Sequence, residues 1–387
     1  MAEEPLRVAL FTGNYNYIKD GVALTLNRLV RFLHSRGVEV LIFAPTGPKP
    51  AFDSFGTVIK VPAFPLPFRP EYLLATGLPE SARQKLKEFK PHLFHIAIPD
   101  VLGYQALRLA KKWQIPVVSS YHTRFDTYLS FYNIGFFEKI GQRYLRYFYR
   151  QCVQVYPPSQ SMADIISEAG YSDDIRIWSR GVDTTVFDPA KRDLAWRREL
   201  GIADQDIVIN FTSRVVKEKN TVLFADVLHR LKTKGYAFHT LIVGDGPELA
   251  NLKKTAPNVI SLGTLGGADL SRAYASSDIF FFPSESETFG NVTLEASASG
   301  LPCVCADASG SQSIVLHNKT GFLIDAKMPN LFVDQIAKLI DEPDYRRSIG
   351  VAAQNHAKSF SWDAILSELL ANYREAIATA AKTKNQR

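Results

Sequence analysis

The sequence of 387 residues is long for one hydrophobic core and comfortable for two, and its 46% apolar and 22% charged residues are ordinary for a folded soluble protein. Its three cysteines imply no disulfide framework, and no apolar run is long enough to span a membrane as a helix. The first residues lack the basic start and apolar segment of a secretory signal, so we expect a cytoplasmic protein. The net charge of +6 suits an anionic substrate or membrane surface, and without a nucleic-acid motif we expect no nucleic-acid partner.

The first half of the chain alternates short apolar runs with helical patterns. The predicted strands are 8–12, 38–44, 93–98, 117–121 and 153–156, and the predicted helices include 22–35, 102–113 and 136–152. Strands that are apolar along nearly their whole length are typical of a parallel sheet covered by helices on both faces.

The same alternation restarts in the second half. The predicted strands there are 207–212, 240–243, 259–262, 279–282, 303–306 and 321–324, with a helix at 222–233. Two such series predict two doubly wound α/β domains, which we place at 1–187 and 188–387. The last long helix, 361–380, is assigned to the second domain, although it could instead cross back onto the first.

The most informative segment is 284–296, which places Glu287 and Glu295 on either side of a predicted helix start. The helix follows Gly290, and a helix N-terminus can hold a phosphate through its free N–H groups. Carboxylates on both sides of a phosphate suit a nucleotide sugar, which carries hydroxyls at both ends of its diphosphate. Two glutamates at this spacing also occur by chance, but the end of an apolar strand is where open α/β sheets bind ligands.

Two cations follow the first strand of the second domain. Arg214 and Lys219 lie where a diphosphate could be clamped and its charge stabilised as it leaves, although exposed cations in such loops are often merely solvated. Gly244 begins a tight turn between a strand and a helix. The one Asp-x-Asp sequence, at 204–206, precedes a strand at a predicted surface turn, so we do not interpret it as a metal site.

The segment 284–302 resembles the Glu-x7-Glu signature of retaining glycosyltransferases, in particular glycosyltransferase family 4, and Arg214 with Lys219 resembles the Arg-x4-Lys pair of that family. The resemblance covers nearly the whole chain and implies the GT-B fold, with two facing Rossmann-like domains and a cleft between them. It implies that Glu287 bonds the donor sugar, that Glu295 bonds the ribose and that the cations bind the diphosphate. The other donor-binding residues implied are Gly21, Gly244, Thr288, Phe289, Gly290, Asn291 and Val292.

The first domain of such enzymes is implied to bind the acceptor. His122 resembles the His of family members that act on lipid acceptors, where it lies near the reacting centre, so it joins Arg214, Lys219 and Glu287 as a catalytic candidate. The acceptor candidates are Tyr15, Asn16, Tyr17 and Arg124, although the three residues of the first loop could equally pack that loop.

The chain departs from the family pattern at several positions. Asp20 replaces the first Gly of the first loop, and Asn220 replaces a Gly but tolerates the left-handed conformation. Ser309 and Ser313 replace family residues near the donor sugar, which leaves the sugar open. Residues 176–183 resemble the branch of lipid-acting sulfoquinovosyltransferases and nucleotide-sugar-dependent α-mannosyltransferases.

These observations predict a retaining, metal-independent hexosyltransferase without a cofactor. It would move a sugar from a UDP- or GDP-linked donor to a hydroxyl of a lipid acceptor. The basic and aromatic stretches 136–150 and 79–90 indicate peripheral contact with an anionic membrane on its cytoplasmic face, although a core helix with a solvated basic face fits the first equally well. The alternatives are a hydrolysing sugar-nucleotide epimerase or a phosphorylase of the same fold, and a sugar- or lipid-binding protein without turnover.

Overall fold

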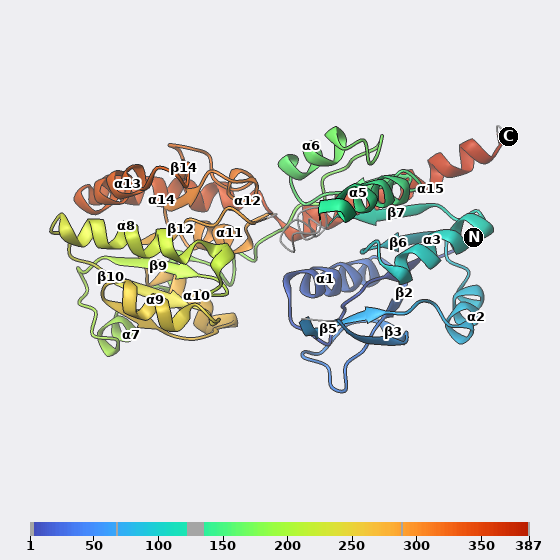
Figure 1. The fold of residues 1–387 in the computed structure, drawn as a ribbon, viewed down its shortest axis with the longest axis horizontal. Coiled ribbons are helices and arrows are strands. Elements are labelled where there is room, and N and C mark those ends of the chain that lie inside the picture. Colours follow the sequence, from blue (N-terminus) through green and yellow to red (C-terminus); the bar gives the residue numbers. More distant parts are fainter. Residues whose placement is uncertain (1–3, 67–68, 122–134, 288, 386–387) are drawn as a thin grey trace. The chain divides into compact units, whose positions relative to one another are not determined.

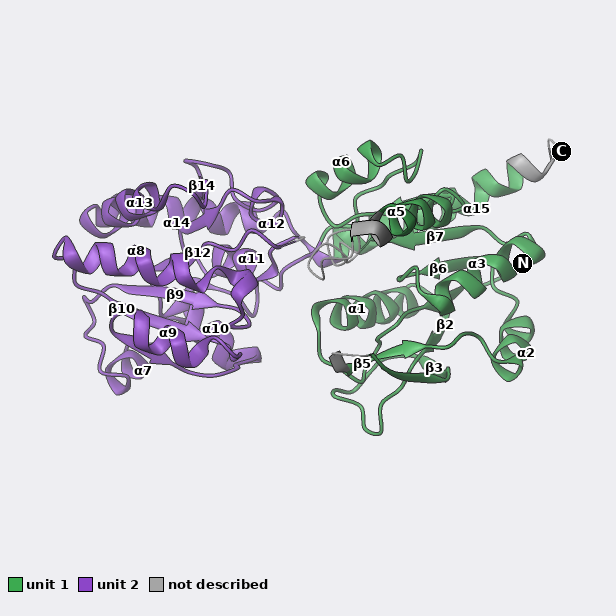
Figure 2. Ribbon diagram, in the orientation of Figure 1, with its two compact units in different colours: residues 1–179, 363–387 green, residues 180–362 purple. Residues whose placement is uncertain are grey.

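The structure is a computed structural model that describes residues 4–66, 69–121, 135–287 and 289–385. The chain forms two compact units, drawn in separate colours in Figure 2. Unit 1 consists of Met1–Ser179 with Asp363–Arg387, and unit 2 consists of Arg180–Trp362.

Unit 1 contains a parallel six-stranded sheet in the order β3-β2-β1-β6-β7-β8 (Figure 1). Its strands are β1 (Arg7–Phe11), β2 (Glu39–Ala44), β3 (Thr57–Lys60), β6 (Leu93–Ile96), β7 (Val117–Ser120) and β8 (Gln154–Tyr156), and β4 (Ala63–Leu66) pairs separately with β5 (Arg69–Ala75). Its helices are α1 (Gly21–Ser35), α2 (Glu80–Phe89), α3 (Val101–Trp113), α5 (Gly135–Tyr149), α6 (Gln160–Glu168) and α15 (Trp362–Asn385). The order of strands reverses between β1 and β6, and this reversal marks the ligand-binding edge of a doubly wound sheet.

The last helix, α15, packs into unit 1. Tyr373 on α15 is fully buried, and its hydroxyl lies 2.5 Å from Nδ1 of His95 on β6. Burial lowers the pKa of His95 to about 3, so its ring is neutral and bonds Ser120 through Nε2 at 3.0 Å. At the surface, Arg176 pairs with Glu375 of α15 at 2.9 Å. These contacts group residues 363–387 with the first unit, whereas the sequence-based boundary placed them with the second.

Unit 2 repeats the architecture with a second parallel six-stranded sheet, β11-β10-β9-β12-β13-β14. Its strands are β9 (Val208–Thr212), β10 (His239–Val243), β11 (Val259–Ser261), β12 (Ile279–Phe282), β13 (Cys303–Ala306) and β14 (Gly321–Ile324). Its helices are η1 (Pro189–Lys191), α7 (Leu194–Glu199), η2 (Lys217–Lys219), α8 (Thr221–Thr233), α9 (Leu249–Thr255), α10 (Gly267–Ala275), α11 (Asn291–Ala298), α12 (Ser309–Gln312), α13 (Pro329–Asp341) and α14 (Pro343–Ala357). Here the order of strands reverses between β9 and β12.

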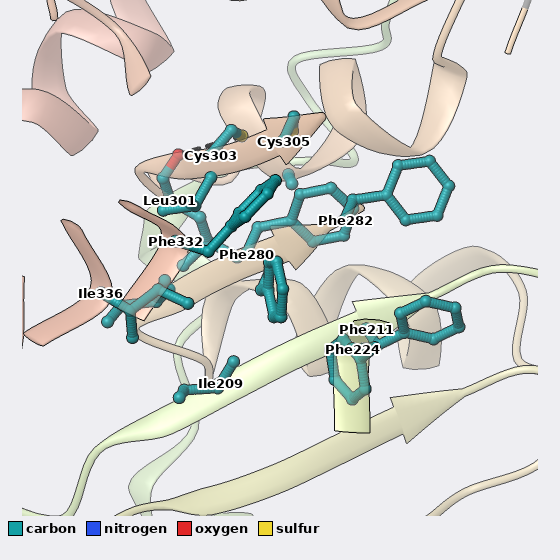
Figure 3. Packing of buried hydrophobic residues seen from close by; sticks show 14 of the residues in the cluster. Ile209, Phe211, Phe224, Phe280, Phe282, Leu301, Cys303, Cys305, Phe332 and Ile336 are labelled. Carbon is teal, nitrogen blue, oxygen red and sulfur yellow. Dashed lines mark hydrogen bonds between the residues drawn. The ribbon is translucent and has the colours of Figure 1, made fainter. Parts of the chain in front are cut away.

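The phenylalanines of β12 anchor the core of unit 2 (Figure 3). Phe280 and Phe282 stack on each other at 5.7 Å, as expected for alternate residues on one face of a strand. Phe281 points to the other face, where it stacks on Phe224 at 5.0 Å and packs against Phe332. Because both faces of β12 are buried, core packing fixes the carboxyl end of this strand, from which the loop carrying Glu287 starts.

The α/β class and the eleven strands expected from the sequence are confirmed, with small shifts at their ends. The sequence analysis did not predict β3, β4 and β5, of which β3 lies at the edge of the main sheet and the other two form a separate pair.

Candidate functional site

The loops after β9 and β12 meet at the reversal point of the sheet in unit 2. Parallel strands bring their carboxyl ends to one edge, so residues far apart in the sequence converge there. Lys219, at the end of η2, is only 8% exposed and forms an ion pair with Glu287, through its Nζ and the Oε1 of the carboxylate. Lys219 Nζ also lies 3.5 Å from the hydroxyl of Ser286. Two of the predicted catalytic residues are therefore in contact.

A hydrogen bond also joins the two loops that carry this pair. The hydroxyl of Ser286 donates to the carbonyl of Glu218 at 3.0 Å, which joins the two loops. Asn220 follows with φ 54° and ψ 47°, so the left-handed conformation predicted for this departure from the family pattern is present. This turn lets α8 begin at Thr221, directly after Asn220.

The backbone of Glu287 is supported from α12. Ser309 Oγ donates to the carbonyl of Glu287 at 2.9 Å. A Cβ at Gly310 would lie 2.3 Å from Cβ of Glu287, so a side chain at this position would displace the glutamate. Ser309, which the sequence analysis noted only as a departure, thus helps to position Glu287.

Gly290 forms the N-cap of α11 in the left-handed conformation, with φ 94°. The next residue, Asn291, is exposed and Val292 is half-buried, whereas Phe289 is 4% exposed and packs edge-on against Phe360 at 6.2 Å. The free N–H groups at the start of α11 therefore lie beside Glu287 in the chain and can receive an anion. Thr288 lies outside the described residues.

Glu295 lies just over one turn into α11 and is half-buried. The buried Tyr274, at the end of α10, donates its hydroxyl to Oε2 of Glu295 at 3.2 Å. Burial raises the pKa of Glu295 to about 7, and burial together with the neighbouring carboxylate raises that of Tyr274 well above its ordinary value. Tyr274 was not predicted as a site residue, since no local pattern in the sequence relates α10 to α11.

Arg214 is exposed, and its guanidinium has no hydrogen bond or ion pair within the described part of the chain. Its loop is fixed by the turn after β10, since Val215 N donates to the carbonyl of Asp245 at 2.9 Å. Gly244 adopts φ 135°, and a Cβ there would lie 1.9 Å from the carbonyl oxygen of Ser213. Gly244 is therefore required for the close approach of the two loops.

The first loop of unit 1 lies at the reversal point between β1 and β6. Tyr15 is fully buried and donates its hydroxyl to the carbonyl of Phe55 at 2.6 Å, so it packs the loop. Asn16 bonds Ser54 at 3.0 Å, and the half-buried Tyr17 donates to the carbonyl of Gly13 at 3.0 Å.

Gly21 is exposed as the first residue of α1, which Asp20 caps by accepting from Ala23 N at 2.8 Å. His122 and Arg124 fall outside the described residues. Within the part of the chain that is described, no group of three or more carboxylate, histidine or cysteine side chains could hold a metal ion, and no helix is both long and apolar enough to cross a membrane.

Two doubly wound parallel sheets in separate units agree with the GT-B fold expected from the sequence. Sucrose-phosphate synthase from Thermosynechococcus elongatus shares this fold with a TM-score of 0.80 and 18% identity, covering 97% of this chain and 100% of that one. HepE from Anabaena, solved with UDP-glucose, has a TM-score of 0.71 and 18% identity, with 95% and 100% covered.

Residues 19–186 match the profile of Glycosyltransferase Family 4, and residues 193–356 match that of Glycosyl transferases group 1. Sulfoquinovosyl transferase SQD2 from Arabidopsis thaliana is 32% identical over 95% of this chain and 73% of its own length. The GDP-mannose-dependent alpha-mannosyltransferase of Mycobacterium tuberculosis is 30% identical over 95% of this chain and 96% of its own length. The alpha-monoglucosyldiacylglycerol synthase of Streptococcus pneumoniae is 27% identical over 96% of this chain and 88% of its own length. The chain belongs to glycosyltransferase family 4 and is a glycosyltransferase that uses nucleotide sugars.

Proposed function

We propose that this glycosyltransferase transfers a hexose with retention of configuration, without a metal ion, to a hydroxyl of a lipid acceptor at an anionic membrane surface. The observation that carries the proposal is the contact between Lys219 and Glu287 at the reversal point of the sheet, beside the N-terminus of α11. A fixed cation and a fixed carboxylate next to free N–H groups suit a ligand that is anionic at one point and rich in hydroxyls at the next.

Each residue of this cluster has a role in the proposed donor complex. Glu287 accepts hydrogen bonds from the sugar, and Glu295 accepts them from the ribose. Lys219, Arg214 and the first N–H groups of α11 bind the diphosphate. The exposed guanidinium of Arg214 is available to a ligand, because no described side chain occupies it.

The proposed reaction takes place on one face of the sugar. The bond between the anomeric carbon and the diphosphate oxygen breaks, and the acceptor oxygen bonds to the same carbon from the same side. The acceptor proton passes to the departing diphosphate oxygen, so no carboxylate nucleophile is needed. Lys219 and Arg214 stabilise the charge that develops on the diphosphate, which is the role that a metal ion has in other transferases.

The proposal of a lipid acceptor is supported by the names of two relatives, one a sulfoquinovosyl transferase and one a monoglucosyldiacylglycerol synthase. It is also supported by α5 and the residue that follows it, where a cationic stripe is formed by Lys139, Arg143, Arg146 and Arg150, all of them exposed. These residues recur every three or four positions and therefore share one face of the helix, opposite the buried Phe148. Such a face suits an anionic membrane surface.

Transfer assays test the proposal. The protein is incubated with UDP- or GDP-linked hexoses and anionic lipid vesicles, with and without excess chelator, and the anomeric configuration of the product is determined by NMR. We expect an α-linked glycolipid from an α-linked donor, in equal yield with chelator. A product of inverted configuration, or a loss of transfer on chelation that magnesium or manganese restores, would contradict the proposal. Release of epimerised sugar or free nucleotide without transfer to lipid would favour the epimerase alternative.

A further inference from the structure

The proposed acceptor unit contains a pocket of about 500 Å³ at the carboxyl end of β6. Aliphatic and aromatic side chains form most of its lining, from Leu74 on β5, Val101 and Tyr104 on α3, and Tyr144 and Tyr147 on α5. This volume lies within the range of small-molecule sites, which are concave and mostly apolar. The pocket also lies beside the reversal point between β1 and β6, where doubly wound sheets bind ligands.

The walls of the pocket are held in a defined arrangement. The hydroxyl of Tyr144 donates to the carbonyl of Pro99 at 2.8 Å, and its ring packs against that of Tyr104 at 6.3 Å. Asp100 caps α3 by accepting from Gly103 N at 2.8 Å. Asp100 itself lines the pocket, but its Oδ1 and the hydroxyl of Tyr144 have partners in the protein, so the pocket offers mainly ring faces and aliphatic groups to a ligand.

The rim of the pocket remains exposed. Val101 is 44% exposed and Tyr147 is 46% exposed, although both are pocket-lining residues. The cationic stripe starts at Lys139, eight residues before Tyr147, and its Arg146 directly precedes Tyr147 in the sequence. Lys111 of α3 lies over the ring of Tyr147, with its Nζ 5.7 Å from the ring centroid. An apolar pocket with cations at its edge is complementary to an amphiphile that has an anionic or strongly polar headgroup.

The stripe keeps charge available for a headgroup. Arg146 and Arg150 each donate through Nε to a carbonyl at the end of α6, that of Ala169 and that of Gly170, at 3.0 Å. Lys139 and Arg143 form no ion pair with any described residue. Lys139 and Arg143 therefore have no described counter-ion, and Lys111 is the cation that the structure places against a pocket-lining ring.

We propose that this pocket between α3 and α5 is a subsite for the aliphatic chain of a lipid acceptor, whose headgroup lies along the cationic stripe. The inference rests on the proposed function, since it names the part of the acceptor that unit 1 recognises. It commits to a hydrocarbon chain as the occupant, because the lining offers few polar atoms that could satisfy a sugar.

Binding measurements with short-chain lipids below their critical micelle concentration test this inference on the full chain. The probes are dihexanoyl phosphatidylglycerol, uncharged dihexanoylglycerol, and glycerophosphoglycerol, which has the anionic headgroup without chains. The test variant is Val101→Glu, which places a charge at the rim of the pocket. Residue 101 is the first residue of α3, where an acidic side chain stabilises the helix, so the variant is expected to fold. The matched control is Val351→Glu, at a valine of α14 in unit 2 that is 52% exposed.

We expect Val101→Glu to raise the dissociation constants of both chain-bearing probes about tenfold. This is the size expected when the burial of about two methylene groups is lost. Val351→Glu should leave both dissociation constants unchanged. Val101→Glu should change the affinity for glycerophosphoglycerol only through its added charge. Tyr147→Ala serves as a second variant, and a thermal melt of each protein confirms that it is folded. The inference is overturned if Val101→Glu and Tyr147→Ala bind the chain-bearing probes like the control, or if the chainless probe binds as tightly as the lipid.

A nucleoside diphosphate titrated into the same preparations separates the two claims. If the nucleotide binds to every variant but the binding of the chain-bearing lipids does not depend on Val101, the pocket assignment fails and the proposed function stands. If no nucleoside diphosphate binds to the wild-type protein, the proposed function itself fails.

Discussion

Lys219 and Glu287 are 68 positions apart in the sequence, yet the ammonium of one contacts the carboxylate of the other. The contact exists because β9 and β12 are neighbours in a parallel sheet, and the loops that follow them leave the same edge. Each residue restrains the other, since their side chains are 11% and 21% exposed. The pair therefore places a cation and a carboxylate side by side before any donor binds.

A double-mutant cycle measures how strongly the two residues are coupled. Lys219→Met and Glu287→Gln should each destabilise the protein, because each leaves a partly buried charge unpaired. The double variant should lose less free energy of unfolding than the two single variants lose in sum. We expect a coupling energy of about 1–3 kcal/mol from urea unfolding. Additive losses within about 0.5 kcal/mol would mean that the pair contributes nothing to the fold.

Replacing Arg214 should impair turnover without affecting stability. Its guanidinium is exposed and has no partner among the described residues, so Arg214→Ala removes no contact within the described fold. We expect turnover to fall by about 2–4 kcal/mol in barrier height, the scale for losing a preorganised charge donor. The control is Lys217→Ala, which removes an exposed cation from the same loop. Equal turnover in the two variants would contradict the assigned role.

The pH dependence of stability should depend on Glu295. Burial raises the pKa of this carboxyl from 4.5 to about 7, so across that interval the folded protein holds a proton that the unfolded chain has released. Stability should therefore fall as the pH rises from about 4.5 to about 7, by an amount on the order of 1–3 kcal/mol.

Glu295→Gln should remove this fall and be more stable than the wild type at about pH 8. Urea unfolding at several pH values measures the effect, with Glu199→Gln, at an exposed glutamate of α7, as the control. Parallel stability curves for the wild type and Glu295→Gln would exclude a buried, proton-binding Glu295.

Membrane binding should depend on salt and on the cationic stripe of α5. We expect flotation with anionic vesicles to weaken as salt rises, because screening shortens the reach of exposed charges. Arg143→Glu should reduce binding more than Lys254→Glu, which makes the same change of charge at an exposed lysine of α9 in unit 2. Equal binding to neutral and anionic vesicles would refute an electrostatic surface, and equal effects of the two variants would place it elsewhere.

The sequence was informative where function depends on the ends of buried strands. The predicted strand 279–282 is apolar on both faces, which fixes where the loop carrying Glu287 begins, and the same reasoning places Lys219 after β9. The αL turn at Asn220 was predictable because Asn tolerates that conformation.

Contacts between distant segments were less predictable. Tyr274 reaches Glu295 and Ser309 reaches Glu287 only through the packing of separate helices, which leaves no local pattern in the sequence. The pattern of α15 identified a helix but not the unit that it joins. Its placement depends on the buried contact of Tyr373 with His95, which is 278 positions away in the sequence.

The division of the donor between the two glutamates is the central claim, and calorimetry with free nucleoside diphosphate tests it most directly. UDP and GDP are titrated into the wild type, Glu287→Ala and Glu295→Ala. Because Glu295 is assigned to the ribose, Glu295→Ala should weaken the binding of the nucleoside diphosphate. Glu287→Ala should leave this affinity largely intact while it impairs transfer, because Glu287 is assigned to the sugar that the free nucleotide lacks. If Glu287→Ala loses the affinity and Glu295→Ala keeps it, the donor lies in the opposite orientation and the account is wrong.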